Sequence, residues 1–404
     1  MRFVTARSEL RAHPPFLRFL LARILGTTAN QMLMVAVSWH MYDITSSAWD
    51  LGMVGLFQFI PALLMTLPAG HLADRLHRGR MFACCMLVQA MLALTLVFTT
   101  TQGLASRELM YAVAVVLGLV RAFQMPAQQA FTPLLVPAAL LQRAIAISSG
   151  GVQAAIIAGP ALGGVLYGFG AVVVYLCSAA LLLAAAVLTW LVRYNHRPVT
   201  TAASWRSVLA GVAFVWQRKV LLGATSLDLF AVLLGGATAL LPIYARDILH
   251  TGPVGLGLLR AAPAVGAFLM SLVLTRWPLE RRVGHALLAA VGFFGVATVV
   301  FGVSHSMLVS LLALMATGAA DNISVVVRLT LVQLETPDEM RGRVAAVNGI
   351  FIGASNQLGE FESGVTADLL GPVGAVLLGG VGTIVVAVSW LRLFPDLARR
   401  DRMR

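Results

Sequence analysis

Seven charged side chains stand out because they fall inside long apolar stretches of the 404-residue chain: Arg121, Asp228, Arg260, Asp321, Arg328, Glu360 and Glu362. A charged group inside hydrocarbon is costly, and it usually faces the interior of a helix bundle or a watery cavity. Carboxylates in such places bind protons, bind cations or pair with a neighbouring base. The chemistry that these residues offer is therefore binding and proton movement.

The stretch "SNQLGEFESG", from Ser355 to Gly364, carries two acids with no base beside them. Spacings of three and four place small and polar residues on one helical stripe, as a cavity wall requires: Gly349, Gly353, Asn356, Glu360 and Ser363. Glu362 points the other way, because two residues turn a helix by about 200°. We expect Glu360 to bind a proton or a cationic group in a cavity, and Glu362 to pair with a neighbouring helix. The alternative is that both only hydrogen-bond between packed helices.

The other charged groups leave two readings open. Asp321 and Arg328 are seven residues apart and share a helix face, so they are either cavity groups or a structural ion pair. Asp228 joins them as a third candidate for proton coupling or substrate binding. Because burial disfavours the charged form of an acid, at least one of the acids in the second half of the chain is expected to be protonated in some state of the transport cycle. In the first half, Asn30, Gln31 and Arg121 are expected to supply polar lining.

Other classes of chemistry lack support. The sequence has no GxSxG, HExxH or P-loop pattern, so we do not expect an enzyme. Its cysteines, Cys84, Cys85 and Cys177, lie in apolar runs without CxxC or histidine spacing, so we expect no metal or other cofactor. The net charge of +12 comes from basic residues between apolar runs, without interleaved aromatics, so nucleic acid is not an expected partner.

The elements that position these groups are membrane-spanning helices. The chain is 59% hydrophobic and only 11% charged, whereas soluble proteins carry about 25% charged residues. Apolar runs of roughly 20 residues, long enough to cross about 30 Å of hydrocarbon, predict an all-α membrane protein with twelve spans. They lie near 17–42, 50–73, 80–101, 108–134, 142–167, 171–194, 220–245, 254–275, 283–303, 306–332, 344–370 and 373–394.

The basic residues predict the orientation. If both termini are cytoplasmic, the inner segments hold 22 Arg and Lys residues, and the outer loops hold only Arg107 and Arg246. Such an excess is typical of the cytoplasmic side, so we expect both termini to be cytoplasmic.

The chain also divides into two similar halves. "PAALLQRAIAIS" begins at Pro137 and "PDEMRGRVAAVN" begins at Pro337, an offset of 200 residues. We predict six-helix bundles at 1–194 and 220–404, joined by a cytoplasmic linker, 195–219, with an amphipathic surface helix. Parallel repeats of this kind suit a transporter that rocks around a midplane site.

The loop "GHLADRLHRGRM" resembles the signature loop of the major facilitator superfamily, with matches at Gly70, Leu72, Asp74, Arg75 and Arg78. The resemblance implies a conformational latch in which Asp74 accepts hydrogen bonds near a helix N-terminus and Arg78 and Arg80 add charge pairs. The alternative is a plain positive-inside loop with one acid for local pairing.

Two further motifs strengthen the resemblance. "AGPALGGVL" is similar to the fifth-helix motif of proton-driven exporters in this superfamily, with Gly159, Pro160, Gly163 and Gly164 in place. It implies a helix bend that limits leak, and the alternative is ordinary close packing. The stretch "RGRVAAVNGIFIGASNQLGEFESG" most resembles the branch of enterobactin-type siderophore exporters.

We therefore expect a proton-coupled exporter of a small amphipathic molecule, a siderophore or a drug-like compound, in the bacterial inner membrane. Its expected partners are that substrate, protons and the lipid bilayer, and we expect a monomer. The alternatives are an importer or facilitator of the same fold, or a non-transporting membrane scaffold or sensor.

The first prediction concerns orientation. A cysteine that replaces Arg107 or Gly170 should react with an impermeant thiol reagent added outside intact cells, and one that replaces Arg197 should not. The parent protein, labelled in parallel, corrects for its own three cysteines. The opposite labelling pattern would overturn the orientation.

Overall fold

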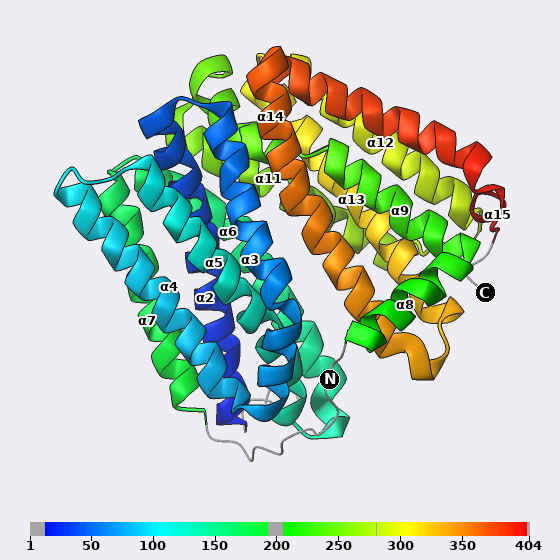
Figure 1. Ribbon diagram of the computed structural model, residues 1–404, viewed down its shortest axis with the longest axis horizontal. Helices are drawn as coiled ribbons and strands as arrows, with labels where there is room; N and C mark the ends of the chain where they lie inside the picture. The colour runs from blue at the N-terminus through cyan, green and yellow to red at the C-terminus, as the bar shows by residue number, and fades with distance from the viewer. Residues whose placement is uncertain (1–12, 193–204, 280, 402–404) are drawn as a thin grey trace. The chain divides into compact units, whose positions relative to one another are not determined.

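The computed structural model describes residues 13–192, 205–279 and 281–401, and within these ranges it contains helices and no strands. The first part of the chain forms long helices joined by short turns (Figure 1). They are α2 (Pro14–Thr45), α3 (Ala48–Arg75), α4 (Arg78–Thr101), α5 (Arg107–Phe131), α6 (Ala138–Tyr167) and α7 (Ala171–Trp190).

The later part is built in the same way. After α8 (Trp205–Gln217), which lies at the end of the predicted linker, come α9 (Lys219–Leu234), α11 (Gly252–Arg276), α12 (Val283–Val303), α13 (Met307–Glu335), α14 (Asp338–Leu393) and the short α15 (Pro395–Ala398). The all-helical prediction is confirmed.

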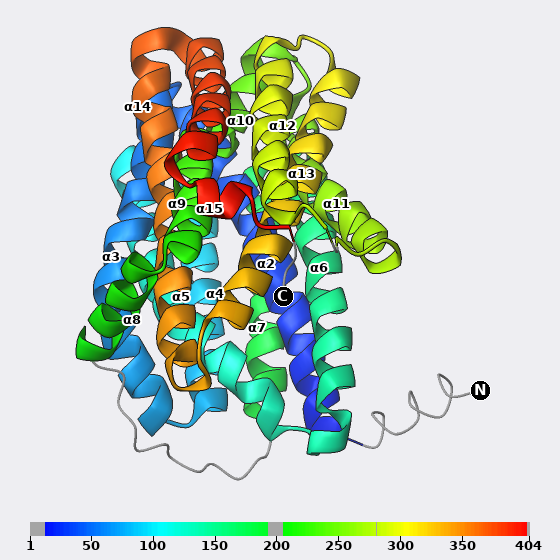
Figure 2. The same ribbon diagram turned by 90° about the vertical axis from the view of Figure 1, so that its right-hand side faces the viewer.

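The described residues contain eleven segments that are long and apolar enough to cross a membrane. One of them, residues 339–393, is two spans in a single run of 55 residues. Gly371 interrupts it with a φ of 76°, a conformation that glycine adopts without steric cost, and Pro372 follows. Figures 1 and 2 show α14 turning back sharply on itself. The eleven segments thus correspond to the twelve predicted spans.

The seventh span differs from the continuous helix predicted over 220–245. Helix α9 ends at Leu234, and the chain continues as a 3₁₀ helix, η2 (Ala237–Leu240), a single turn, α10 (Leu241–Ile243), and a π-helix, η3 (Tyr244–Ile248). Gly235 and Gly236 weaken the helix, and Pro242 lacks the N–H that a helix interior needs. Because the span is hydrophobic throughout, this break was not predicted from the sequence.

The contacts divide the chain into two compact units. The first contains residues 1–40 and 60–203, and the second contains residues 41–59 and 204–404. The segment 41–59, which is the end of α2 and the first part of α3, therefore packs with the later helices. Division at the linker alone, as predicted from the sequence, does not capture this segment.

Aromatic packing builds the core of the first unit. Phe19 of α2 meets Phe82 of α4 and Phe131 of α5 edge to face, with ring centroids 5.6 and 4.6 Å apart. All three rings are fully buried, and such edge-to-face pairs stabilise a core beyond the area they bury. Helices α4, α5 and α7 are joined around this cluster.

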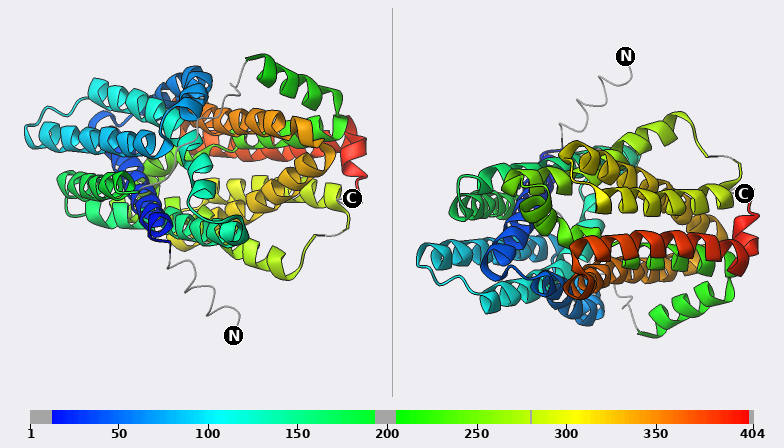
Figure 3. Two further views of the ribbon diagram at one scale, coloured as in Figure 1. Left: turned by 90° about the horizontal axis from the view of Figure 1, so that it is seen from below. Right: turned by 90° about the horizontal axis from the view of Figure 1, so that it is seen from above.

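Close approach of backbones builds the second unit. Helix α11 packs on α13, and α14 packs on α9 and α12 (Figure 3). At the crossing of α11 and α13, a Cβ added to Gly318 would overlap the carbonyl oxygen of Pro263, and one added to Gly266 would overlap that of Met315. Small residues permit this approach, as is common between membrane helices.

The second prediction tests this crossing. Gly318→Ala should destabilise the protein by about 1–3 kcal/mol, because the backbones must separate to admit the methyl group. Gly349→Ala is the matched control, since Gly349 is also inside a helix but has no neighbouring atom within 4 Å of the added Cβ. It should be neutral or stabilising, as alanine favours helix. Thermal unfolding of the purified variants measures both, and equal midpoints would contradict the packing role.

Candidate functional site

A cavity of about 210 Å³ lies within the second unit. It is bounded by the end of α9 and the broken segment after it, and by α11, α12, α13 and α14. Three side chains with acidic or amide groups line it: Asp321 from α13, and Asn356 and Glu360 from α14. The structure thus brings together three residues that the sequence had suggested as cavity groups.

Helical spacing explains how these groups reach one cavity. Asn356 and Glu360 are four residues apart on α14, so their side chains lie one above the other on the same face. Asp321 follows Thr317 by four residues on α13, and Thr317 also lines the cavity. Thr238 and Thr298 complete the uncharged polar lining, and apolar side chains, including Phe294 and Phe301, form most of the rest.

Glu360 has close neighbours on two other helices. Gly55 of α3 packs on it so closely that an added Cβ would lie 3.1 Å from Glu360 Oε2. Arg260 of α11, a half-buried residue, interacts electrostatically with the Glu360 carboxylate. A few residues further along α14, Gly364 meets Gly52 of α3 backbone to backbone. Glu360 therefore lies between the cavity and the contact of α14 with α3.

Arg328 forms a buried ion pair with a residue other than Asp321. Its Nη2 lies 3.1 Å from Asp228 Oδ2 of α9, with 2% and 6% of the two side chains exposed. Its Nη1 donates a hydrogen bond of 2.8 Å to Asn348 Oδ1 of α14. An Asp321–Arg328 pair, one of the two readings of the sequence, is therefore wrong. Asp228 is not among the residues that line the cavity, because it is held in this pair.

Asp321 has no direct partner among the residues that the structure describes. No hydrogen bond or ion pair to its carboxylate is found within the described residues, and its charged neighbours, Asp228 and Arg328, act on it only electrostatically. Seven residues separate Asp321 from Arg328 on α13, which is about 10 Å of helix rise. The guanidinium group thus stays with Asp228, and Asp321 faces the cavity.

Glu362 has a local role. Its Oε1 accepts a hydrogen bond of 2.8 Å from the hydroxyl of Thr366, one turn further along α14. Glu362 does not line the cavity. The predicted separation of the two glutamates on opposite faces agrees with this placement, but the hydrogen bond that Glu362 makes is within its own helix and not to a neighbouring one.

The candidate residues of the first unit mostly serve packing. A Cβ added to Gly159 of α6 would come 2.6 Å from Gln31 Cβ of α2, and one added to Gly163 would come 2.9 Å from Met32 Cα. Helix α6 runs from Ala138 to Tyr167 without interruption at Pro160, and Gly164 is buried. The motif therefore brings α6 against α2, the packing alternative, and no break in the helix accompanies it. Asn30 is half-buried and Arg121 is exposed.

The signature loop connects α3 to α4. The side chains of Asp74 and Arg75 lie outside the described residues, so their role stays a prediction. Gly70 has no neighbouring atom within 4 Å of an added Cβ. His77 caps the N-terminus of α4, where its Nδ1 accepts a hydrogen bond of 3.4 Å from the backbone N–H of Arg80. Arg78 is half-buried and the side chain of Arg80 is exposed.

Sequence reasoning missed three polar side chains. Arg23 of α2 donates a hydrogen bond of 2.6 Å to Ser148 Oγ of α6, which a search for bases inside the first predicted span would have found. Gln58 and Gln357 are each 5% exposed, and their amide nitrogens have no hydrogen-bond partner within the described residues. Nothing in their spacing marks these two glutamines.

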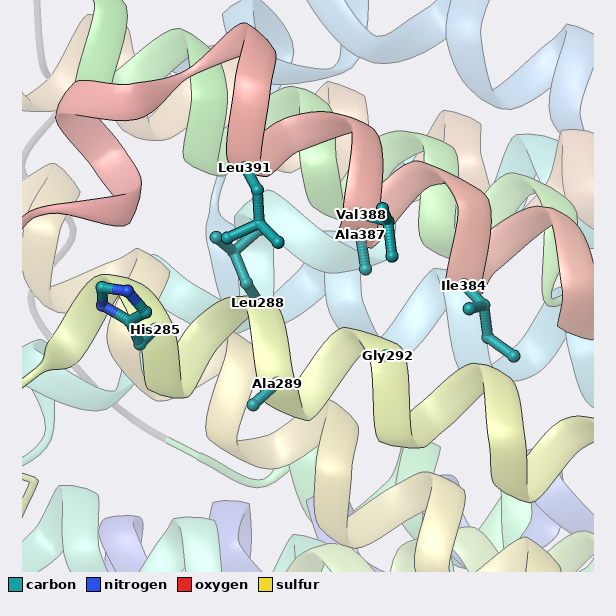
Figure 4. A pocket seen from close by; sticks show the side chains of 8 residues that line it. All are labelled: His285, Leu288, Ala289, Gly292, Ile384, Ala387, Val388 and Leu391. Atoms are coloured by element: carbon teal, nitrogen blue, oxygen red, sulfur yellow. The ribbon is translucent and has the colours of Figure 1, made fainter.

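A second hollow, of about 310 Å³, lies between α12 and the last part of α14 (Figure 4). Leu288 of α12 and Leu391 of α14 point toward one another across it, and His285 is its one side chain with a titratable group. Because several of its lining side chains, among them Val388 and Leu391, are exposed, this hollow is an apolar surface groove and offers no convergent polar chemistry.

Half-buried carboxylates that line a cavity among membrane-spanning helices are typical of membrane transporters. The profile of the transmembrane secretion effector family matches residues 8–402, and the chain belongs to this family of the major facilitator superfamily.

Curated relatives share almost the whole chain. The Enterobactin exporter EntS of Citrobacter koseri is 27% identical over 403 residues, covering 97% of this chain and 94% of the relative. The protein of the same name from Escherichia coli O81 is 25% identical over 402 residues, with the same coverage.

Solved structures share the fold at lower identity. A variant of the nucleoside transporter NupG superposes with a TM-score of 0.75 at 14% identity, covering 94% of this chain and 100% of that one. A bacterial homologue of the human lysosomal transporter Spinster gives 0.74 at 16% identity, covering 97% of each chain. A bacterial homologue of the iron transporter ferroportin gives 0.70 at 16%, covering 96% and 99%. These likenesses confirm the major facilitator fold.

The third prediction concerns the buried ion pair. Asp228→Asn leaves the Arg328 charge buried without its counterion, and removing one partner of such a pair costs about 3–5 kcal/mol. The double variant Asp228→Leu with Arg328→Met should recover most of this loss, because no charge then remains buried. The unfolding midpoints of the purified variants measure both changes.

The exposed pair between Asp43 Oδ1 and Arg246 Nη1, 3.1 Å apart, is the control. Its two side chains are 53% and 39% exposed, so Asp43→Asn should cost no more than about 1 kcal/mol. A loss from Asp228→Asn as small as this would show that the buried pair is solvated.

Proposed function

We propose that this protein is a secondary active transporter that exports a small amphipathic molecule across the bacterial inner membrane in exchange for protons. The observation that carries the proposal is the cavity in the second unit, where Asp321 and Glu360 face a shared space among membrane-spanning helices. The relatives named as enterobactin exporters support the direction and suggest a siderophore as substrate. The proposal includes a monomer with both termini in the cytoplasm.

The proton step uses the cavity carboxylates. Glu360 and Asp321 both line the cavity, and Arg260 of α11 and Gly55 of α3 are neighbours of Glu360. Arg328 is paired with Asp228, and Arg260 acts electrostatically on Glu360. A proton on Glu360 removes the cost of keeping a carboxylate charge in the cavity when the cavity is closed to water. Opening the cavity to the cytoplasm lets the proton leave and the substrate enter.

The other motifs have supporting roles in this proposal. The loop with Gly70, Asp74, Arg75, Arg78 and Arg80 acts as the cytoplasmic latch that the superfamily resemblance implies. Gly159 and Gly163 set the spacing of α6 and α2, which limits leak through the first unit. Arg121, exposed on α5, joins the polar lining of that unit.

An importer or a facilitator of the same fold is the alternative. An importer would move substrate into the cytoplasm with a proton, and a facilitator would move it with no dependence on the gradient. A non-transporting scaffold or sensor would show neither movement. Flux measured under gradients of both signs separates the four cases.

The fourth prediction tests the proton step. Inside-out vesicles with an acidic interior should accumulate enterobactin, the substrate named for the relatives, in exchange for protons that leave. Glu360→Gln resembles the protonated acid and should fold and still bind substrate. In this variant the stimulation of transport by the proton gradient should fall at least about tenfold, because no proton can be released at this position. A tenfold change in rate corresponds to about 1.4 kcal/mol in the activation barrier.

Glu362→Gln is the matched control, because Glu362 accepts a hydrogen bond from its own helix and does not line the cavity. It should keep gradient-driven transport. If Glu360→Gln transports as the parent does and Asp321→Asn does not, Asp321 carries the proton. If no acidic substitution alters the gradient dependence, the protein is a facilitator.

A further inference from the structure

The side chains that line the cavity present hydrogen-bond acceptors. Four uncharged polar side chains line it, and three of them donate one hydrogen bond each to a carbonyl of their own helix. Thr298 Oγ1 donates to the Phe294 carbonyl at 2.9 Å, Thr317 Oγ1 to that of Leu314 at 2.7 Å, and Asn356 Nδ2 to that of Ile352 at 2.7 Å. The two threonine hydroxyls are then left with their oxygens as acceptors, whereas Asn356 keeps its side-chain oxygen as an acceptor and its second N–H as a donor.

The charged groups that line the cavity add further hydrogen-bond acceptors. Ionised carboxylates only accept hydrogen bonds, and Asp321 accepts none within the described residues. Glu360 has Arg260 as an electrostatic partner, whereas the nearest base to Asp321, Arg328, is committed to Asp228. Asp321 is therefore the one carboxylate of the cavity whose charge no base directly opposes among the described residues.

The break in the seventh span adds partial negative charge to the same cavity. Helix α9 ends at Leu234, and Val232, Gly235 and Gly236 at this end line the cavity. The C-terminal end of a helix carries a partial negative charge and carbonyl groups without intrahelical partners. Broken helices of this kind bind cations in other transporters. This feature is independent of the carboxylates.

We infer that the cavity binds a primary ammonium group carried on an apolar body, with Asp321 as its counterion. An ammonium supplies three donors and no acceptor, which complements a lining that supplies acceptors. Phe294, Phe301 and Leu314 line the cavity beside these groups and suit an apolar or aromatic body. The inference rests on the proposed function, because it names a class of drug-like substrate, distinct from a siderophore, for that same cavity.

An inorganic cation fits the cavity less well. No cluster of three or more His, Cys, Asp or Glu side chains within the described residues is placed to hold a metal ion. The lining consists mostly of apolar side chains, which cannot replace the hydration shell of a small ion. An organic ammonium ion can contact both the polar acceptors and the apolar side chains of the lining.

The test compares three probes of one shape: 2-phenylethylamine, which is a cation at pH 7, 2-phenylethanol, which is neutral, and phenylacetate, which is an anion. Calorimetry on the purified full-length protein should show that the amine binds at least about tenfold more tightly than the alcohol. Phenylacetate and sodium chloride should not bind. Equal affinity for the amine and the alcohol, or a preference for phenylacetate or sodium, would overturn the inference.

Two substitutions locate the site. Asp321→Asn should abolish the preference for the amine over the alcohol, and Asp368→Asn, an exposed acid on α14, should leave it unchanged. Thr317→Val keeps the shape of the side chain and removes one acceptor. It should therefore lower the affinity for the amine about threefold to tenfold without changing the affinity for the alcohol. If Asp321→Asn does not fold, Thr317→Val decides; full amine affinity in that variant refutes the site.

The outcomes separate this inference from the proposed function. If the amine does not bind while enterobactin is still exported under a proton gradient, the inference fails and the proposed function stands. If the amine binds through Asp321 but neither compound moves under a gradient, the proposed function fails and the cavity is a binding site alone.

Discussion

Within the hydrocarbon of a bilayer there is no water to solvate a charge or to accept a hydrogen bond from a broken helix. Several polar groups of the second unit are paired in a way that meets this constraint. Arg328 is buried with Asp228 and Asn348 as its partners, Glu362 accepts from Thr366, and Thr298, Thr317 and Asn356 donate to carbonyls of their own helices. The carboxylate of Asp321, which lines the cavity, is not paired in this way among the described residues.

The cavity depends on residues that have little or no side chain. Gly235 and Gly236 line the cavity where α9 ends at Leu234, and Gly236 packs so closely on α14 that an added Cβ would lie 2.5 Å from the carbonyl oxygen of Gly359. Gly266 and Gly318 allow α11 and α13 to approach at their crossing, and Gly318 also lines the cavity. On the other side of Glu360, Gly55 admits the carboxylate against α3. The glycines thus set the size of the space, and the charged residues set its chemistry.

Periodicity and composition predict much of this fold, because they report on properties that repeat within one helix. The twelve spans and the opposite faces of Glu360 and Glu362 follow from apolar runs and from the helical turn. The partner of Arg328 does not follow from them, since Asp228 lies on another helix and Asp321 offered a matching spacing on the same helix. The break after Leu234 was visible as Gly235, Gly236 and Pro242, but continuous hydrophobicity outweighed these signals.

The Asp228–Arg328 pair also has a consequence for how the chain enters the membrane. Its two members are 100 residues apart in the sequence, and translation at roughly 5–20 residues per second separates them by about 5–20 s. During this time α9 carries an acid that has no counterion, at a cost of about 2.5–3.5 kcal/mol for a charge at the helix centre. We expect α9 to remain protonated at Asp228, or to stay beside the insertion machinery, until α13 arrives. We therefore expect formation of this ion pair to be a late step in the insertion of the second unit.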